Sequence, residues 1–562
     1  MLKDIFHKKY FSYFYFLLLI VCICISTSFI WSVSFWNDEW RGIADVFTHG
    51  VNTISYQGKI VTITWGNIGQ LLLRGRVLGV LLVNRLLMLS LLDPTLLSLF
   101  AVIFHIINSC LVYAICVSIT KNRLFSSFAG LFFALSNTHN EVFTWIGAGI
   151  LTLCSMTGAL LTFFILTARI RQWKIYAVVL ALLIAFISYE LKENTAFLFP
   201  FIMVFLYVYR RELKEVSGKI LPAIVVSIVL FSLGLTYAQK IQLVNMQVTN
   251  ISSALGKILF NIVFYPSVLL SQNYIPYQVV MAIRMQLLKI PEYFFLPITE
   301  TIGINGNLFL FDLLSLALSF LIIFCVSEVY RRHEHLRRII FFGAVFYIFS
   351  FIPVAIRVVT RSNGYITFYY LYYQSFAASI WISCLMVYGT DFFRKKTKIP
   401  VVLCVAVFYF IFLIYENITG ARTAIVLGSK SKQFIRSFKQ LNITVPNKPI
   451  FYVQSNTAFS LGGITTRLPF MLGSGFILSI LNYQSGNIPS ELLDQRYLEP
   501  FDSVGYMEIK EKGYGFFWNY ADLKKEFTEN PKLTPDQVIG LHYNFDGNLV
   551  DITKEVRTEL QK

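Results

Sequence analysis

A series of long apolar runs separated by short polar loops constrains the fold of this chain more than any other feature. A helix needs roughly 20 consecutive apolar residues to cross a bilayer. Only 14% of the 562 residues are charged, against about a quarter in a soluble protein. We therefore predict a polytopic α-helical membrane protein with about 11 transmembrane helices. The predicted spans cover approximately 11–35, 94–119, 124–138, 143–168, 175–189, 193–209, 220–238, 306–328, 339–356, 366–388 and 400–416.

The first apolar run, 11–35, follows a lysine-rich N-terminus. A signal peptide has a shorter apolar region and a cleavage site of small residues. This run is longer and ends in Trp36-Asn37-Asp38-Glu39-Trp40, which offers no such site. We predict that it is retained as the first span.

Lysine and arginine gather in alternate loops, which all fall on one side of the membrane if the predicted spans are right. Basic short loops mark the cytoplasmic side. This placement accounts for the net charge of +17 without a nucleic-acid partner. We predict a multi-pass protein of the cell (inner or plasma) membrane with its N-terminus in the cytoplasm. The basic groups are Lys121/Arg123, Arg169/Arg171/Lys174, Arg210/Arg211/Lys214/Lys219, Arg331/Arg332/Arg337/Arg338 and Arg394/Lys395/Lys396/Lys398.

The composition changes near residue 425, where charged residues and short β-prone runs return. Ile450-Phe451-Tyr452-Val453 follows Pro449, and Asp546-Gly547 between apolar residues is a hairpin signal. We predict a transmembrane module over 1–424 and a small exterior α+β domain over 425–562. Residues 70–92 are apolar but carry arginines, which favours an interfacial helix over a spanning one.

All eight cysteines fall within apolar runs. There is no CxxC pair and no His/Cys cluster that would indicate a structural metal. We interpret the cysteines as small apolar packing residues. His105, alone inside the second span, is likewise interpreted as a hydrogen-bonded packing residue.

Acidic residues follow three of the predicted spans on the exterior side. They are Asp38 and Glu39, then Glu141 after His139, then Glu190 and Glu193. Each loop alone equally fits a solvated turn with interfacial tryptophan. Spans 124–138 and 175–189 are short, however, so the loops after them should dip below the surface and line a recessed cavity. Converging carboxylates beside a cavity suit general base catalysis or cation binding.

Cationic residues lie on the same predicted face. Arginine binds phosphate in a bidentate manner, so a lipid phosphate at this interface would need such partners. The alternative is that these side chains simply snorkel to the interface. Snorkelling explains Lys192 and Arg361 least well. The other cations on this face are Arg74, Arg76, Arg85 and Arg357.

The order of these motifs resembles the GT-C superfamily of integral-membrane glycosyltransferases, which includes protein O-mannosyltransferases and aminoarabinose transferases. Asp38-Glu39 is similar to the family's acidic site in the first exterior loop. His139-Asn140-Glu141 with Trp145-Ile146-Gly147 resembles its second exterior loop, and Glu190-Leu191-Lys192-Glu193 its Lys-Glu segment. The resemblance covers roughly 30–210, with a weaker echo at 353–376. Residues 239–305 and 425–562 have no family pattern that we can align.

The resemblance implies transfer of a sugar from a polyprenyl-phosphate donor to a glycan, lipid or protein acceptor on the exterior face, with inversion. Asp38 of the acidic pair would be the base, and Glu39 and Glu141 further catalytic acidic groups. The donor phosphate would be held by Lys192, Arg361 and Arg76. The acceptor would be contacted or oriented by His139, Glu190 and Glu193. The resemblance implies no required cofactor, although some members of the family use a divalent cation held by carboxylates.

Two other functional classes fit parts of the pattern. A glycan polymerase or ligase also uses polyprenyl-linked substrates, but its chemistry typically sits in a large late exterior loop, whereas Asp38-Glu39 comes early. A transporter or flippase places ionisable groups at mid-membrane, in broken helices or repeats. The predicted spans have few internal charges and no visible repeat.

Overall fold

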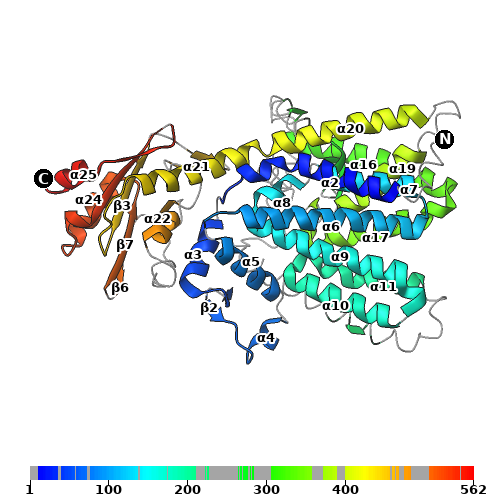
Figure 1. Cartoon of the computed structure of the whole chain (residues 1–562), viewed down its shortest axis with the longest axis horizontal. Helices are drawn as coiled ribbons and strands as arrows, with labels where there is room; N and C mark the ends of the chain where they lie inside the picture. The colour runs from blue at the N-terminus through cyan, green and yellow to red at the C-terminus, as the bar shows by residue number, and fades with distance from the viewer. Residues whose placement is uncertain are drawn as a thin grey trace.

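The structure, a computed structural model, is a bundle of apolar helices with a mixed β-sheet beyond one of its ends (Figure 1). It describes residues 11–35, 39–56, 59–72, 76–90, 92–136, 139–173, 175–209, 306–356, 371–388, 399–455, 459–461, 464–466, 474–482, 505–509, 511–544 and 546–562, with short pieces between 222 and 286. The bundle helices are α2 (Phe11–Ser26), α6 (Thr95–Thr120), α7 (Arg123–Leu135), α9 (Ile146–Trp173), α10 (Ile175–Leu191), α11 (Leu198–Val208), α16 (Gly306–Arg332), α17 (Glu334–Ile356), α19 (Ser375–Tyr388) and α20 (Ile399–Gly420).

Among the described residues, 5 helical segments are long and apolar enough to cross a membrane. They begin at Phe11, Thr95, Ile146, Asp312 and Glu334. Several shorter apolar helices accompany them, including α7, α10 and α19. A polytopic helical membrane protein is consistent with this set. The predicted span 220–238 lies almost entirely outside the described residues.

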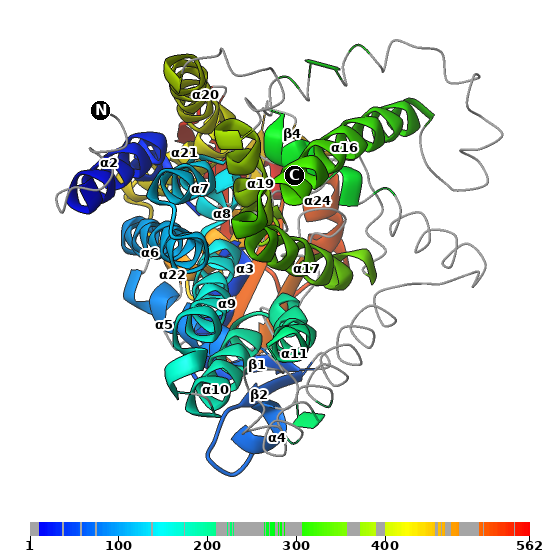
Figure 2. The same ribbon diagram turned by 90° about the vertical axis from the view of Figure 1, so that its right-hand side faces the viewer.

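Residues within or beside four of the five predicted basic loops lie together at one end of the bundle, although the basic residues of 210–219 and 394–398 are outside the described residues. The Asn122 amide donates to the Tyr388 hydroxyl at 2.7 Å, and a His335 ring nitrogen lies 2.8 Å from the same hydroxyl. The Arg338 guanidinium lies over the Tyr209 ring, 5.6 Å from its centroid. Segments near residues 122, 209, 335 and 388 therefore share one end, which we call the basic end and which faces the viewer in Figure 2.

The opposite end carries a small subassembly between the bundle and the sheet (Figure 1). It consists of α3 (Glu39–His49), the hairpin β1 (Thr53–Tyr56) with β2 (Lys59–Thr62), α4 (Ile68–Leu72) and α5 (Val77–Ser90). The interfacial helix predicted over 70–92 is thus two helices, and Arg76 before α5 has a left-handed backbone with φ 70°. Glycine at position 79 lets α5 lie directly against the end of α10, because a Cβ there would collide with the carbonyl oxygen of Leu191.

Gly79→Ala is expected to destabilise the protein by about 1–3 kcal/mol, because the backbone of Leu191 cannot yield as a side chain would. Thermal unfolding of purified protein measures the effect. Gly42→Ala within α3 is the matched control, since its Cβ meets nothing within 4 Å and alanine favours a helix. Equal stability of the two variants would contradict the close packing of α5.

The C-terminal part begins with α21 (Arg422–Gln440), so the predicted boundary at 425 falls inside a helix. The sheet order is β6-β7-β3-β8-β9, with β3 parallel to both neighbours and the edge strands antiparallel. The β8–β9 hairpin turns at Asp546-Gly547 as predicted, and Gly547 has φ 84°. The strands are β3 (Ile450–Ser455), β6 (Gly505–Ile509), β7 (Lys512–Phe517), β8 (Val538–Tyr543) and β9 (Leu549–Asp551), with a separate hairpin of β4 (Phe459–Leu461) and β5 (Ile464–Thr466).

Strand β3 shows why this sheet is a middle layer. Its apolar residues alternate between the two faces, so Phe451 packs near Phe438 of α21 while Ile450 joins Leu523 and Val556 on the other face. The latter two residues belong to α24 (Tyr520–Glu529) and α25 (Thr553–Leu560). A strand that is covered on both faces has a continuous apolar run, and β3 has one in Ile450-Phe451-Tyr452-Val453. A further helix, α22 (Ser474–Asn482), packs against α3 and links the sheet region to the bundle.

Candidate functional site

Several bundle helices stop short of the end that faces the sheet. α7 has 13 residues and α19 has 14, so each is about 20 Å long, against the roughly 30 Å of a hydrocarbon core. The chain beyond them forms what we call the polar floor, residues 139–144, 192–197 and 371–375. His139, Lys192 and Gln374 on this floor are buried. A small cavity of about 10 Å³ lies beside Ser375 of this floor and is also lined by Asn273. The recessed cavity stays a prediction, because most of 239–305 and all of 357–370 lie outside the described residues.

Two candidate carboxylates lie at the starts of helices. Glu39 accepts a hydrogen bond from the backbone N–H of Gly147 at 2.8 Å, in the first turn of α9. Glu190 accepts one from the N–H of Val77 at 3.3 Å, where α5 begins. Both side chains are buried. Negative charge is favourable at a helix N-terminus, so these contacts help to stabilise buried carboxylates there.

Asp93 shows the same pattern nearby, outside the spans. It accepts hydrogen bonds from the amide of Thr95 at 3.1 Å and from its hydroxyl at 2.6 Å, where α6 begins. The hydrogen bond from the Thr95 hydroxyl is the main cause of a lowered pKa of Asp93. Acidic side chains at this end of the bundle thus repeatedly accept hydrogen bonds from backbone amides at helix N-termini.

Lys192 lies beside the first turns of the same helix that Glu39 contacts. Its ammonium donates to the carbonyl of Ala148 at 3.4 Å and to the hydroxyl of Thr152. The side chain is only 3% exposed. Glu39 and Lys192 therefore approach neighbouring positions of α9, one as an acceptor and one as a cation.

Arg76 and Glu193 form an ion pair, with Nε and Oε2 3.0 Å apart. The Glu193 side chain is 4% exposed and that of Arg76 39% exposed. The Tyr373 hydroxyl lies 2.5 Å from that of Ser155 on α9. We call Glu39, Arg76, Glu190, Lys192 and Glu193 the charged cluster. It is chemically suited to holding an anionic group beside a proton acceptor.

A second network surrounds His105 and explains it as a packing residue, as predicted. One ring nitrogen faces the Ala134 carbonyl at 2.9 Å and must donate, so the other, 2.9 Å from the Tyr372 hydroxyl, accepts. The Asn108 amide donates to that hydroxyl at 3.1 Å. The His139 ring meets that of His105 edge to face, with their centroids 4.5 Å apart, and its Nε2 lies 3.4 Å from the Ser375 hydroxyl.

Tyr372→Phe is expected to destabilise the protein by about 2 kcal/mol, because it leaves the accepting nitrogen of His105 buried without a donor and removes one of the two hydrogen bonds that the Asn108 amide donates, the other going to the Leu153 carbonyl. Tyr415→Phe, at a tyrosine that is 54% exposed, is the control. Thermal unfolding measures both variants. Unchanged stability of Tyr372→Phe would show that the hydroxyl holds no network together.

The structure does not place every predicted site residue. Asp38 and Arg361 lie outside the described residues. Glu141 lies within helix α8 (Asn140–Thr144), whose backbone is described but not this side chain. His139 adjoins the His105 network. The end of the bundle opposite the basic end holds four other candidates, which are Arg76, Glu190, Lys192 and Glu193.

Two buried acidic residues were not predicted as candidates. Asp312 is fully buried in α16, near the end opposite the basic end, and Glu416 is buried in α20. Their signal in the sequence is a single carboxylate inside a long apolar run, which marks function often enough to be noted. Gln374 on the polar floor is fully buried, and within the described part of the chain its amide has no hydrogen-bond partner.

In the described segments, no group of three or more His, Cys, Asp or Glu side chains is arranged to hold a metal ion. Comparison with known proteins adds no relative, because no family model, no curated protein and no solved structure matches this chain. What the site can do must therefore be argued from its own residues.

Proposed function

We propose that this chain is a membrane glycosyltransferase that moves a sugar from a polyprenyl-phosphate donor to a glycan, lipid or protein acceptor. The observation that carries the proposal is the charged cluster, in which buried carboxylates, the buried Lys192 and the partly exposed Arg76 lie at one end of the bundle. A sugar transfer from a lipid phosphate needs both kinds of group at one place. The acidic pair that follows the first span adds Asp38 to Glu39 in the sequence.

The proposed topology has about eleven spans, with the basic end in the cytoplasm and the charged cluster on the exterior side. The sheet region then lies outside the cell membrane, next to the site through α3 and α22. Nucleotide sugars are cytoplasmic, so a site on this face uses a lipid-linked donor. The contact of α22 with α3, which begins at Glu39, makes the sheet region a candidate for acceptor choice.

In the proposed reaction, Asp38 takes the proton of the acceptor hydroxyl. At the same time the oxygen of that hydroxyl attacks the anomeric carbon of the donor sugar. The bond from that carbon to the phosphate oxygen breaks, and the polyprenyl phosphate leaves with the electron pair. A single displacement of this kind inverts the anomeric centre. Lys192, Arg361 and Arg76 stabilise the leaving phosphate. Lys192 already donates two hydrogen bonds to α9 and Arg76 pairs with Glu193, so donor binding exchanges some of these contacts.

Deletion of the gene, followed by mass spectrometry of surface glycans and lipid A, tests the proposal. Loss of one sugar substituent, restored by the wild-type gene, is the expected result and would also identify the acceptor. Shortened or unattached polymer chains would favour the polymerase or ligase. An unchanged glycan profile with altered uptake would favour a transporter.

A further inference from the structure

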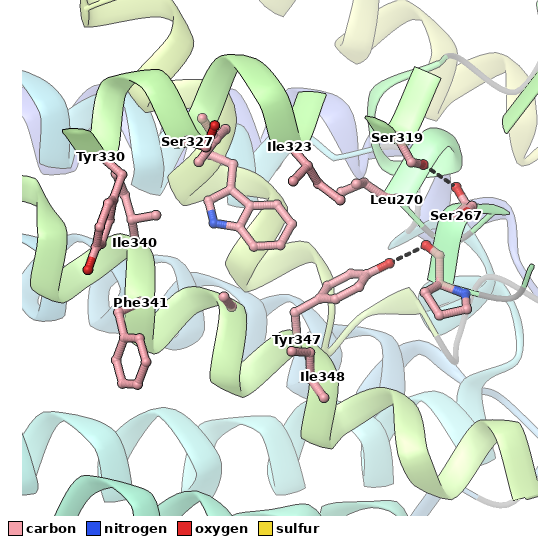
Figure 3. A pocket seen from close by; sticks show the side chains of 14 residues that line it. Ser267, Leu270, Ser319, Ile323, Ser327, Tyr330, Ile340, Phe341, Tyr347 and Ile348 are labelled. Atoms are coloured by element: carbon pink, nitrogen blue, oxygen red, sulfur yellow. Dashed lines mark hydrogen bonds between the residues drawn. The ribbon is translucent and has the colours of Figure 1, made fainter. Parts of the chain in front are cut away.

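A groove of about 470 Å³ lies on the side of the bundle, between α16, α17 and α19 (Figure 3). Ile323 and Tyr330 of α16 face Ile340 and Ile348 of α17 across it, with Trp381 of α19 also in its lining. Its volume falls within the range of ligand pockets, roughly 300–1,000 Å³. It is distinct from the charged cluster, since none of the cluster's residues lines it.

The groove presents mainly carbon atoms, because two of the hydroxyls in its lining are hydrogen-bonded to backbone carbonyls. The Ser319 hydroxyl donates to the carbonyl of Ser267 at 2.9 Å, and the Tyr347 hydroxyl donates to the carbonyl of Pro266. These bonds turn the hydroxyls toward the backbone beside the groove and leave carbon atoms on its surface (Figure 3). A ligand made of hydrocarbon fits such a lining, while a sugar or nucleotide would lose hydrogen bonds to water without replacement.

The groove opens on the outer surface of two helices that are apolar enough to cross a membrane. Ile323 is 52% exposed and Ile348 56% exposed, so both would meet lipid. At 1.5 Å per residue, the stretch of α16 from Ser319 to Tyr330 is about 16 Å long. This length matches one leaflet, because half of the hydrocarbon core is about 15 Å thick.

Positive charge lies where the groove ends at Tyr330. Arg331 and Arg332 follow directly, are exposed, and share one acidic partner, Glu328. Arg337 at the start of α17 donates to the carbonyls of Tyr330 and Arg331. A guanidinium has five N–H donors, and the hydrogen bond from Arg331 to Glu328 uses one of them, which leaves donors on Arg331 for a phosphate. Charge complementarity therefore selects an anionic head group at the basic end.

We propose that this groove binds an anionic phospholipid of the leaflet at the basic end, with one acyl chain between α16 and α17 and its phosphate at Arg331 and Arg332. The site is a structural lipid site, remote from the charged cluster. This proposal does not rest on the proposed sugar transfer. The experiments below therefore test it even if the sugar transfer is disproved.

The first test measures lipid retention. The full chain is placed in nanodiscs of phosphatidylcholine with or without phosphatidylglycerol, extracted, and examined by native mass spectrometry. Wild-type protein is expected to retain phosphatidylglycerol in preference to phosphatidylcholine. Arg331→Gln with Arg332→Gln is expected to weaken this binding about 30-fold, at roughly 1 kcal/mol for each basic residue. Lys121→Gln, at an exposed lysine in another basic-end loop, is the control and should bind as wild type.

The second test fills the groove. Ala344→Trp places a ring into the groove and should remove most of the retained lipid, whereas Ala317→Trp on the exposed side of α16 should not. Both variants must elute as wild type in size exclusion. Equal retention of both lipids by wild type, or full retention by Ala344→Trp, would overturn the proposal.

A photo-crosslinking residue at Ile348 identifies the occupant. A phospholipid adduct is expected. A cross-link to another part of the same chain, or to a second copy, would mean that protein fills the groove and would also overturn the proposal. The arginine double variant keeps the test meaningful if Ala344→Trp fails to fold, because its changes lie on the exposed surface.

Discussion

Replacing Arg76 by methionine is expected to lower the free energy of unfolding by about 2–3 kcal/mol, because it leaves the Glu193 carboxylate buried without its cation. Breaking a buried ion pair from one side typically costs 3–5 kcal/mol. Arg76 is 39% exposed, so water screens part of the interaction and the lower figure applies. Chemical or thermal unfolding in micelles measures the loss.

The double variant Arg76→Met with Glu193→Gln is the matched control. Neutralising the carboxylate removes the penalty, so the double variant is expected to be more stable than Arg76→Met alone. Both variants carry methionine on the same left-handed backbone at position 76, so the difference between them reports on the charge of Glu193. Equal losses for the single and double variants would show that the ion pair contributes nothing and that Arg76 acts through packing.

Arg76→Lys separates the two roles of this residue. Lysine keeps the charge beside Glu193, so stability should fall little. A lysine does not reproduce the bidentate binding of a phosphate, so sugar transfer should fall if Arg76 also holds the donor. A variant that is stable and fully active would remove Arg76 from the donor site and leave it a partner of Glu193 only.

The helices of the bundle were predictable because apolar length is a local property of the sequence. The predicted span 94–119 corresponds to α6 (Thr95–Thr120), and 306–328 to the longer α16 (Gly306–Arg332). In the predicted span 366–388, Leu371 is helical and turns at 372–374 separate it from α19, which begins at Ser375, while 366–370 lie outside the described residues. Hydropathy reports which residues avoid water, and aromatic residues in a buried turn avoid it equally well.

The site was predictable in its residues but not in its contacts. The sequence places Glu39, Glu190, Lys192 and Glu193 after spans on one face, and the structure brings these regions to one end. Their partners come from remote positions, since Gly147 is 108 positions from Glu39 and Val77 is 113 from Glu190. Such contacts depend on how helices pack, which no local pattern records. The sequence therefore did not predict that Glu39 and Glu190 accept hydrogen bonds from the N-termini of α9 and α5.

The hydrogen bond from Gly147 gives Glu39 a positioning role within the acidic pair. One of its carboxylate oxygens accepts this bond at the start of α9, so Glu39 holds α3 against α9. A carboxylate has a second oxygen that can take a proton, so this bond does not decide which member of the pair is the base. The proposed reaction assigns the base to Asp38, and variants of both residues test the assignment.

Asp38→Asn is expected to reduce sugar transfer about 10²–10⁴-fold, the usual contribution of a general base, while the protein still inserts and folds. Glu39→Gln is the matched control. The glutamine side-chain oxygen accepts from the same Gly147 amide, so most activity should remain. Each variant is expressed in the deletion strain, the missing sugar is measured by mass spectrometry, and size exclusion confirms folding. If Asp38→Asn transfers sugar as wild type does and Glu39→Gln does not, the base is Glu39. If both variants are fully active, the double variant Asp38→Asn with Glu39→Gln decides the matter, and its full activity would show that the acidic pair has no part in the chemistry.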